Sequence, residues 1–292
     1  MNKDMPELTE VELTMRVLKP MIVGKSILDF STDWPRGLKS VLKLPAIKRE
    51  IRGRKIARLK RRGKVLFMET SSSSKRSFAL HLRMSGSLLW GFSDKLRLHT
   101  DRKHVHFNWR FTSGEELWFS DPRKFGVVWY GTPEEMNDER YLRTLGPDAA
   151  SITPSEFRNR ITKHRGMLKP FLLRQDFIAG LGNIIVDEML WEAKLHPRHP
   201  AEFLVYSDIE RLYACMKKVI RCILAAEGNT VRNWIMPDGT EGRSALRLRV
   251  YDRKGQPCVR CSRPIGRIVV GGRGTHVCSK CQRVSSPASM KD

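Results

Sequence analysis

The sequence predicts an α+β protein of several domains: an N-terminal β-sandwich with an opening helix, a helical domain, and a small C-terminal module built on four cysteines. Three observations lead to this fold class. Short segments between residues 26 and 130 alternate like strands and are separated by turn residues, which favours a two-layer sandwich. From about Pro154 the apolar residues follow helical spacing, and near the C-terminus the cysteines occur in close pairs. At 292 residues the chain is long enough for two packed domains and a small module.

The first element is a helix that begins within the run Met5-Pro6-Glu7-Leu8-Thr9-Glu10-Val11-Glu12. Thr9 and Glu12 match a capping box, so the helix is expected to start there. Its apolar face is marked by Val11, Met15 and Leu18. The plain interpretation is that Pro6 and Thr9 start a surface helix and do nothing more.

Pro6 has a second interpretation if it is the first residue of the mature chain. An α-amine titrates near 7.7 to 8.0 and a lysine near 10.4, so part of the proline nitrogen is unprotonated at neutral pH. Such a secondary amine can attack an electrophilic carbon and form an iminium, while Glu7 shuttles protons. The residues Met1–Asp4 precede Met5, and if they are kept Pro6 is an internal imide without a basic nitrogen. We expect translation to begin at Met5, or the leader to be trimmed.

The β region follows the opening helix. Alternation is clearest in Val105–Phe111, where odd positions are apolar and even ones polar, as in a half-buried strand. The run Ser71–Lys75 is expected to form a flexible hairpin tip. The predicted strands are Ser26–Phe30, Lys55–Leu59, Val65–Met68, Phe78–Met84, Ser87–Trp90, Val105–Phe111, Glu116–Phe119 and Val127–Tyr130.

The second half of the chain is predicted to be helical. Ser207–Glu210 matches a capping box that opens a long amphipathic helix, which Gly228 is expected to close. Between Leu172 and Leu190 we expect a helix, a tight turn at Ala179–Asn183 and a second helix. The glycines of that turn leave backbone amides free at a helix start, where a phosphate can approach closely. Residues 231–249 are expected to be a loop.

Four of the six cysteines indicate a metal site. Two Cys-x-x-Cys pairs are separated by sixteen residues, which is the spacing of a zinc ribbon. A secreted disulfide scaffold is the alternative, but no signal sequence supports it. Cys215 and Cys222 lie in a helical pattern and are expected only to pack. The sequence therefore predicts one structural Zn²⁺, held by Cys258, Cys261, Cys278 and Cys281.

Composition indicates the kind of partner. The formal net charge is +23 and the isoelectric point is near 10.2, which implies a polyanion. The apolar content is that of a globular protein and not of a disordered basic tail. No apolar run reaches the roughly 18 residues of a membrane span, and no secretory leader is evident. We expect an intracellular protein of the cytoplasm or nucleoid, without a membrane partner.

Five separated motifs resemble the formamidopyrimidine-DNA glycosylase family, in the order in which that family has them. They are the opening Met5–Glu12, His81–Ser87, Asp121–Gly126, Gln175–Glu188 and Val250–Cys258 with the cysteines. The resemblance implies an N-terminal β-sandwich, a helix-two-turn-helix domain and a C-terminal zinc finger, with DNA crossing the cleft between domains. It also implies a monomeric enzyme acting on damaged double-stranded DNA. Such an enzyme removes 8-oxoguanine and formamidopyrimidines and then cuts the strand by β,δ-elimination, with no nucleotide cofactor.

The resemblance assigns a role to each matching residue. A base must leave the stack before it can be removed, and side chains must fill the hole that it leaves. The void-filling residues are Met84, Arg123 and Phe125. The catalytic residues are the nucleophile Pro6, Glu7, Lys64 as proton donor, and Arg273, which grips phosphates with its guanidinium fork. The DNA-binding residues are His104, Arg123, Lys169 and Asn183.

Most of these residues also have a plainer interpretation. Lysines such as Lys64 and Lys169 usually stay exposed and hydrated, and Met84 and Phe125 beside strands are more often core residues. The zinc finger can be a structural staple only. His106, next to His104 along the strand, is expected to be structural.

The predicted domains are residues 5–150 (β-sandwich), 151–246 (helix-two-turn-helix) and 247–285 (zinc finger), with a tail at 286–292. Two related activities compete with the main interpretation. The endonuclease VIII type shares the fold and prefers oxidised pyrimidines, but it opens with Pro-Glu-Gly and keeps its wedge residues in one loop. Thr9 replaces a proline usual in the formamidopyrimidine pattern, which loosens the match. A non-catalytic damaged-DNA-binding protein is the alternative if the leader is retained, and a zinc-ribbon transcription factor is a third.

Overall fold

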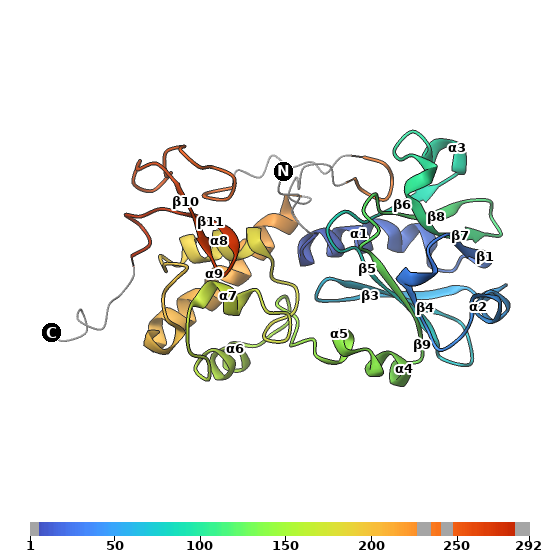
Figure 1. The fold of residues 1–292 in the computed structure, drawn as a ribbon, viewed down its shortest axis with the longest axis horizontal. Coiled ribbons are helices and arrows are strands. Elements are labelled where there is room, and N and C mark those ends of the chain that lie inside the picture. The colour runs from blue at the N-terminus through green and yellow to red at the C-terminus, as the bar shows by residue number, and fades with distance from the viewer. Residues whose placement is uncertain (1–5, 227–234, 241–247, 284–292) are drawn as a thin grey trace. The chain divides into compact units, whose positions relative to one another are not determined.

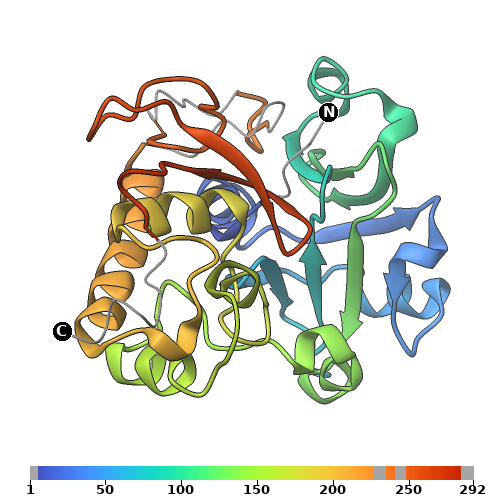
Figure 2. The ribbon, with the colours of Figure 1, turned by 60° about the vertical axis from the view of Figure 1, so that its left-hand side comes forward.

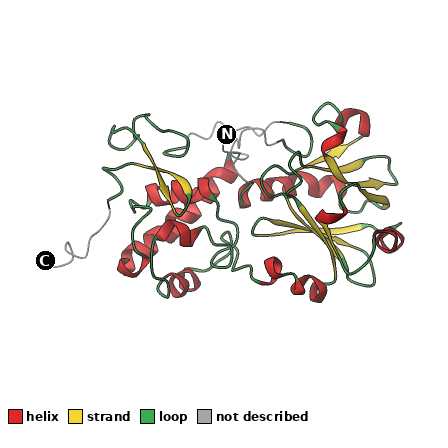
Figure 3. Ribbon diagram, in the orientation of Figure 1, coloured by secondary structure: helices red, strands yellow, loops and turns green. Residues whose placement is uncertain are grey.

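The structure is a computed structural model that describes residues 6–226, 235–240 and 248–283. The chain divides into two compact units. Unit 1 comprises residues 1–144 and 227–244, and unit 2 comprises residues 145–226 and 245–292. Figure 3 shows that strands dominate the first unit and helices the second. Among the described residues, no helix has both the length and the apolar character required to cross a membrane.

Unit 1 is a β-sandwich, which confirms the predicted fold class (Figure 1). One sheet has the order β2-β9-β5-β4-β3 and the other β1-β7-β8-β6, and every neighbouring pair is antiparallel except β2 with β9. The strands are β1 (Ile27–Thr32), β2 (Leu38–Lys39), β3 (Ile56–Arg62), β4 (Val65–Thr70), β5 (Ser77–His81), β6 (Ser87–Gly91), β7 (Val105–Phe111), β8 (Glu116–Ser120) and β9 (Val127–Gly131). The helices are α1 (Leu8–Ile22), α2 (Leu44–Ile51), α3 (Ser93–Leu96), α4 (Pro133–Asp138) and α5 (Arg140–Arg143), with 3-10 turns at Pro35–Gly37 and Arg102–His104.

The core of unit 1 lies between the two sheets. Phe30 of β1 and Phe78 of β5 are fully buried with ring centroids 5.2 Å apart, so aromatic packing joins one sheet to the other. The buried face of α1, including Val11, Leu18 and Ile22, belongs to the same cluster. Burying this helix against the sandwich fixes the start of the chain relative to the sheets.

All eight predicted strands are present, with ends shifted by a few residues. The largest correction is at the predicted strand Phe78–Met84, which ends at His81 because Arg83 turns the backbone into the left-handed region at φ 55°. The alternation in β7 does not mark a half-buried strand, since only Arg110 is exposed. His106 is buried against Asp33, with 2.8 Å between Nδ1 and Oδ1, which agrees with the structural role predicted for it.

Two further corrections concern helix starts. The N-cap of α1 is Glu7, and the capping-box partner is Glu10, whose Oε2 accepts the Glu7 backbone N–H at 2.8 Å. The predicted Thr9–Glu12 box does not form, because Thr9 already lies inside the helix; the two Glu12 oxygens instead pair with Arg16 at 2.9 Å and Arg61 at 2.8 Å. In unit 2, α9 begins at Tyr206 with Val205 as N-cap, so the predicted Ser207–Glu210 box is wrong.

Unit 2 packs helices against a small hairpin module. Its elements are α6 (Pro154–Ile161), α7 (Leu168–Leu172), α8 (Asn183–Glu192), a 3-10 turn (Ala201–Phe203), α9 (Tyr206–Ala225), β10 (Gly266–Val270) and β11 (Arg273–Val277). Residues 184–191 of α8 are buried, and this helix packs on α9 and on β11. The hairpin β10–β11 is the red pair of strands in Figure 2. Cys215 is buried in α9 but Cys222 is exposed, so only the first packs as predicted.

Part of the predicted loop at residues 231–249 belongs to unit 1. In the described piece, residues 235–240, the Pro237 carbonyl accepts the Trp90 N–H at 2.7 Å and Ile235 packs beside Leu89 and Trp118. Gly228, residues 231–234 and 241–247, the leader Met1–Asp4 and the predicted tail at 286–292 lie outside the described residues. The three-part division of the chain into the predicted domains stays a prediction.

Candidate reaction site and nucleic-acid interface

The start of α1 gathers acidic side chains in the interior of unit 1. Pro6 is buried immediately before the N-cap Glu7, whose side chain is 2% exposed. Glu10 accepts hydrogen bonds from the backbone N–H of Glu7 and, at 3.0 Å, from the hydroxyl of Thr9. Burial raises the pKa of the Glu10 carboxyl above its usual value. Pro6, whose nitrogen is the predicted nucleophile, therefore lies beside carboxyl groups that can hold protons in a low-dielectric environment.

Lys64 lies close enough to this group for its charge to act on it. It immediately precedes β4 in a tight turn in which Gly63 has φ 58°, and it is 2% exposed. Its positive charge favours the ionised form of Glu10 and disfavours protonation of His81. Because its side chain is buried, the interpretation of Lys64 as a hydrated surface lysine is excluded.

His81 is a site residue for which the sequence analysis gave no role. It ends β5, is 2% exposed, and lies 2.9 Å through Nε2 from the hydroxyl of Tyr141. Its Nδ1 accepts the backbone N–H of Arg83 at 3.0 Å. Burial first, and then the charges of Arg83 and Lys64, hold the pKa of His81 well below its ordinary value of 6.5. The ring is therefore neutral, and its Nε2–H donates to Tyr141.

The predicted void-filling residues come together on two loops joined by Asp121, which is 1% exposed. The Ser85 hydroxyl donates to one Asp121 oxygen, and the same oxygen accepts the backbone N–H of Arg123 at 3.2 Å. The second oxygen accepts the N–H groups of Phe125 at 2.7 Å and of Gly126 at 2.6 Å. A single carboxylate thus fixes both loops. The sequence motif contained Asp121, but its role depends on Ser85, which is 36 residues away.

The three void-filling side chains on these clamped loops differ in exposure. Phe125 is 48% exposed, which excludes core packing for it, and Met84 is partly buried. The Arg123 guanidinium lies 5.0 Å from the centre of the Phe125 ring, and its Nε donates to Ser85 at 3.3 Å. Arg123 Nη2 is buried and has no hydrogen-bond partner among the described residues.

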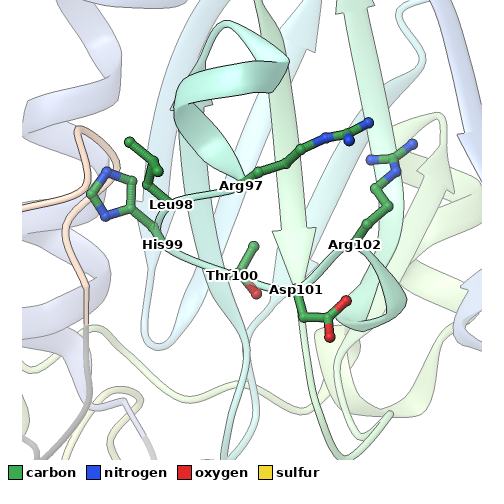
Figure 4. A pocket seen from close by; sticks show the side chains of 6 residues that line it. All are labelled: Arg97, Leu98, His99, Thr100, Asp101 and Arg102. Atoms are coloured by element: carbon green, nitrogen blue, oxygen red, sulfur yellow. The ribbon is translucent and has the colours of Figure 1, made fainter.

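His104 adjoins the same loops. Its carbonyl accepts the N–H of Asp121 at 2.8 Å, and its side chain is partly exposed. The preceding basic segment, Arg97–Arg102, lines an open cavity of about 560 Å³. In Figure 4 the guanidinium groups of Arg97 and Arg102 lie on one side of the segment, with Leu98 and His99 on the other. Arg102 also stacks over Trp118, 4.7 Å from the ring centre.

In unit 2, the turn before α8 and the hairpin β10–β11 meet at a polar cluster. The Asn183 side-chain amide donates to the Gly274 carbonyl at 3.1 Å, and Lys169 Nζ donates to the same carbonyl at 3.3 Å. Lys169 is fully buried and forms an ion pair with Asp187, with 2.5 Å between Nζ and Oδ1. The other oxygen of Asp187 accepts the backbone N–H of His276 at 2.8 Å. The interpretation of Lys169 as an exposed, hydrated lysine is therefore excluded.

Arg273 is exposed next to this cluster. It opens β11 directly after Gly271 and Gly272, whose φ values of 55° and 75° give the twist that a two-residue hairpin turn needs. A Cβ on Gly271 would lie 2.6 Å from Pro170, so this turn also packs closely on α7. The hairpin holds the arginine at its tip, beside the amides that begin α8.

The predicted metal ligands converge. The ligand atoms of the four cysteines lie within 4.8 Å of one another, with Sγ separations of 3.9 Å for Cys258–Cys281 and 3.4 Å for Cys261–Cys278. Four thiolates at about 2.3 Å from one ion have this spacing, whereas a disulfide needs about 2.05 Å. The donor set and geometry fit one tetrahedral structural zinc ion, as predicted. Nearby, Gln282 accepts the Cys278 N–H at 2.9 Å and ties the module to Leu195 of the helical part of unit 2.

Three family models match successive parts of the chain. Residues 5–128 match the family model of the formamidopyrimidine-DNA glycosylase N-terminal domain, and residues 145–234 match that of the H2TH domain of the same glycosylase. Residues 255–284 match the zinc finger found in FPG and IleRS.

Curated relatives and solved structures cover nearly the whole chain. Formamidopyrimidine-DNA glycosylase of Bacillus cereus is 38% identical over 281 residues, covering 95% of this chain and 99% of the relative. That of Geobacillus kaustophilus is also 38% identical, covering 96% and 100%. The Lactococcus lactis Fpg complex with abasic-site DNA has a TM-score of 0.83 at 32% identity, covering 95% and 99%. MutM bound to DNA with carbocyclic 8-oxo-G has a TM-score of 0.83 at 33% identity, covering 95% and 100%.

Proposed function

Because the chain belongs to the formamidopyrimidine-DNA glycosylase family, we propose that it is a bifunctional DNA glycosylase and AP lyase of base excision repair. Its substrates are oxidised purines, 8-oxoguanine and formamidopyrimidines, in duplex DNA. One observation carries the proposal for this chain. Pro6 and Glu7 are buried at the start of α1, in the unit that also holds Lys64 and the exposed wedge residue Phe125.

The chemistry begins with a mature chain whose first residue is Pro6. The lone pair of its nitrogen attacks C1′ of the damaged nucleotide, and the bond from C1′ to the base breaks. The base leaves with the electron pair and takes a proton, and ring opening gives an iminium between C1′ and the proline nitrogen. Glu7 and Lys64 carry the protons between these groups.

The iminium then drives strand cleavage. It acidifies the C2′ hydrogen, so removal of that proton expels the 3′ phosphate, and a second elimination expels the 5′ phosphate. Arg273 stabilises the departing phosphate with its guanidinium fork. Amine, carboxylate, ammonium and guanidinium groups carry both steps. A zinc ion held by Cys258, Cys261, Cys278 and Cys281 would keep the hairpin folded, so that Arg273 is presented.

The side chains of Met84, Arg123 and Phe125 on the Asp121 loops occupy the hole left by the extruded nucleotide. Phe125 and Met84 wedge between bases, and Arg123 faces the orphaned partner base. The buried Nη2 of Arg123, which has no partner in the described residues, is available to donate to an acceptor on that base.

The remaining DNA contacts go to the phosphate backbone. His104 and Asn183 bind the strand directly, with Asn183 at the amides that begin α8. Lys169 acts on the lesion strand indirectly, because its ammonium is buried against Asp187. It donates to the same Gly274 carbonyl as Asn183 and so helps to fix the position of Asn183. The net charge of +23 supports binding to the polyanionic backbone, and we propose that the protein binds DNA of the nucleoid as a monomer.

A reduction experiment tests the proposal. Duplexes carrying 8-oxoguanine opposite cytosine are incubated with the protein and borohydride, which converts an iminium to a stable cross-link. We expect a covalent complex, and without reductant we expect strand ends that carry phosphate on both sides of the gap. A matched duplex with thymine glycol serves as the comparison. Faster processing of thymine glycol would assign the chain to the endonuclease VIII type, and failure to cross-link either duplex would leave a non-catalytic binding protein.

A further inference from the structure

The loop that carries Met84 is tied to α5 by an aromatic side chain from outside the recognised motifs. Tyr141 lies in α5, accepts the Nε2–H of His81 at 2.9 Å, and stacks on Trp129 with ring centroids 6.1 Å apart and planes 3° apart. The Arg83 guanidinium lies 5.0 Å from the centre of the Tyr141 ring. Tyr141 therefore touches residues on both sides of Leu82, just before the wedge residue.

Arg83 holds an unfavourable backbone conformation in this loop. Its φ of 55° falls in the left-handed region, which costs free energy for any residue with a Cβ. The conformation persists because the Arg83 N–H donates to His81 Nδ1 and because the guanidinium rests on Tyr141. One favourable hydrogen bond and one cation–π contact oppose the backbone strain, so the arrangement adds little net stability.

The second half of the same loop is fixed separately. The Ser85 hydroxyl donates to Asp121, and the Gly86 N–H donates to the Leu82 carbonyl at 2.9 Å. Met84 therefore stands between two anchors, one made by Tyr141 with His81 and one made by Asp121. A residue that must enter a base stack quickly gains from such preorganisation, since fixing the loop beforehand removes the ordering cost from the insertion step.

We propose that His81, Arg83 and Tyr141 form a clasp that presets the loop of Met84 for insertion into DNA, which makes Arg83 and Tyr141 positioning residues for nucleotide extrusion. The inference rests on the proposed function and deepens it. The clasp acts through Met84 and does not touch the reacting sugar. Its loss slows extrusion from a duplex and leaves the chemistry at an already exposed sugar unchanged.

Substitutions can separate the clasp from the fold. Arg83→Gly removes the guanidinium and also relieves the backbone strain, so its melting temperature is expected to equal or exceed that of the wild type. Extrusion is nevertheless expected to slow by roughly tenfold, which corresponds to the loss of one modest interaction in the transition state. Arg83→Lys keeps a cation over Tyr141 and is expected to recover most of the rate. Tyr141→Phe keeps the ring and loses the hydroxyl, so its rate falls between those of the wild type and Tyr141→Leu.

The control variant is Lys75→Gly. Lys75 has nearly the same strained φ, 58°, at the turn between β4 and β5, and no DNA role is assigned to it. It is expected to show the same gain in stability with an unchanged extrusion rate. Extrusion is followed by the fluorescence of 2-aminopurine placed beside 8-oxoguanine in a duplex, under single-turnover conditions. Cleavage of a single-stranded abasic oligonucleotide reports the chemistry without a stack to enter.

The outcomes are distinct. Slow extrusion by Arg83→Gly and Tyr141→Leu, with wild-type cleavage of the single-stranded abasic site, supports the clasp. The proposal is overturned if both variants extrude the nucleotide at the wild-type rate. It is also overturned if they lose as much rate on the single-stranded abasic oligonucleotide as on the duplex. Absence of borohydride cross-linking by the wild-type protein would instead overturn the proposed function, so the two failures are distinguishable.

Discussion

Each unit has a buried aspartate in its candidate site, but the two aspartates bind different partners. In unit 1, Asp121 is 1% exposed and accepts hydrogen bonds from the Ser85 hydroxyl and from backbone N–H groups that include those of Arg123 and Phe125. In unit 2, Asp187 is fully buried and faces the ammonium of Lys169. The first is a carboxylate bound by neutral donors, and the second is half of a buried ion pair.

This difference shows which contacts of each site can be predicted from the local sequence. Asp121 precedes Pro122 and binds N–H groups two to five residues ahead, which is the local behaviour of an aspartate at a turn. Lys169 is 18 residues from Asp187, and no local pattern shows that a lysine will be buried. A local pattern can therefore indicate the loop that presents Arg123, whereas no local pattern indicates the burial of Lys169.

The largest expected effect comes from breaking the ion pair of unit 2. Asp187→Ala leaves the Lys169 ammonium buried without its partner, so the free energy of unfolding should fall by about 3–5 kcal/mol. Chemical denaturation followed by circular dichroism measures the change. The control is the double variant Lys169→Met with Asp187→Leu, which replaces the pair by apolar groups and should recover most of the loss. A loss below about 1 kcal/mol in the single variant, the level of an exposed pair, would show that the pair is not desolvated.

The second effect tests the neutral clamp of unit 1. Asp121→Asn keeps the shape but points an amide NH₂ toward backbone N–H groups, so stability should fall by about 1–3 kcal/mol. Because the clamp fixes Phe125 and Ser85 together, excision from an 8-oxoguanine duplex should fall further than the stability change accounts for. The matched control is the exposed Asp94→Asn, for which both quantities should stay near wild type. Equal excision by Asp121→Asn and the wild type would contradict the clamp.

Acid should lower the stability of unit 1 through His81. Its pKa is lowered in the folded chain, so the unfolded chain binds more protons below about pH 6.5, and stability is lost as the pH falls through that range. The slope contributed by one group is at most about 1.4 kcal/mol per pH unit. Denaturation of wild type and His81→Gln at several pH values gives the difference.

His164 of unit 2 also has a lowered pKa and serves as a comparison for His81. Burial and the charge of Arg174 also lower the pKa of His164, but its side chain is only partly buried. His164→Gln should therefore flatten the acid limb less than His81→Gln does. The reverse ranking would show that His81 is not the acid-sensitive group.

The smallest expected effect on stability comes from Phe125. Its side chain is 48% exposed, so Phe125→Ala should change the free energy of unfolding by no more than about 0.5 kcal/mol. Excision from a lesion-containing duplex should nevertheless fall strongly, because the hole in the stack is no longer filled. Thermal melts and single-turnover excision measure the two quantities. Parallel losses in both would assign Phe125 to packing.

The sequence was most informative where one short pattern determines the structure. Alternation located all eight predicted strands, and cysteine spacing identified the zinc ligands, since both signals are local. It failed where distant residues compete. Glu12 pairs with Arg61, 49 residues away, and not with a helix cap, and Tyr141 reaches His81 across 60 residues. The two-residue strand β2 has no pattern of its own and is defined by its pairing with β9.

One missed element did carry a signal. Helix α2 begins with Pro45 in its first turn and buries Ile47 and Ile51, which are four residues apart on one face. The run is short and rich in lysine and arginine, so its helical pattern is weaker than the strand patterns that follow it. Tertiary packing against β1 supplies what the short pattern lacks.

The central claim concerns the nitrogen of Pro6. The most direct test is to reduce the protein on 8-oxoguanine duplex, digest the cross-linked product, and map the attachment site by mass spectrometry. We predict an adduct on the nitrogen of Pro6, with Pro6 as the first residue of the chain. Attachment to Lys64 or another lysine, or a chain that still begins at Met1 or Met5 yet cleaves at full rate, would contradict it.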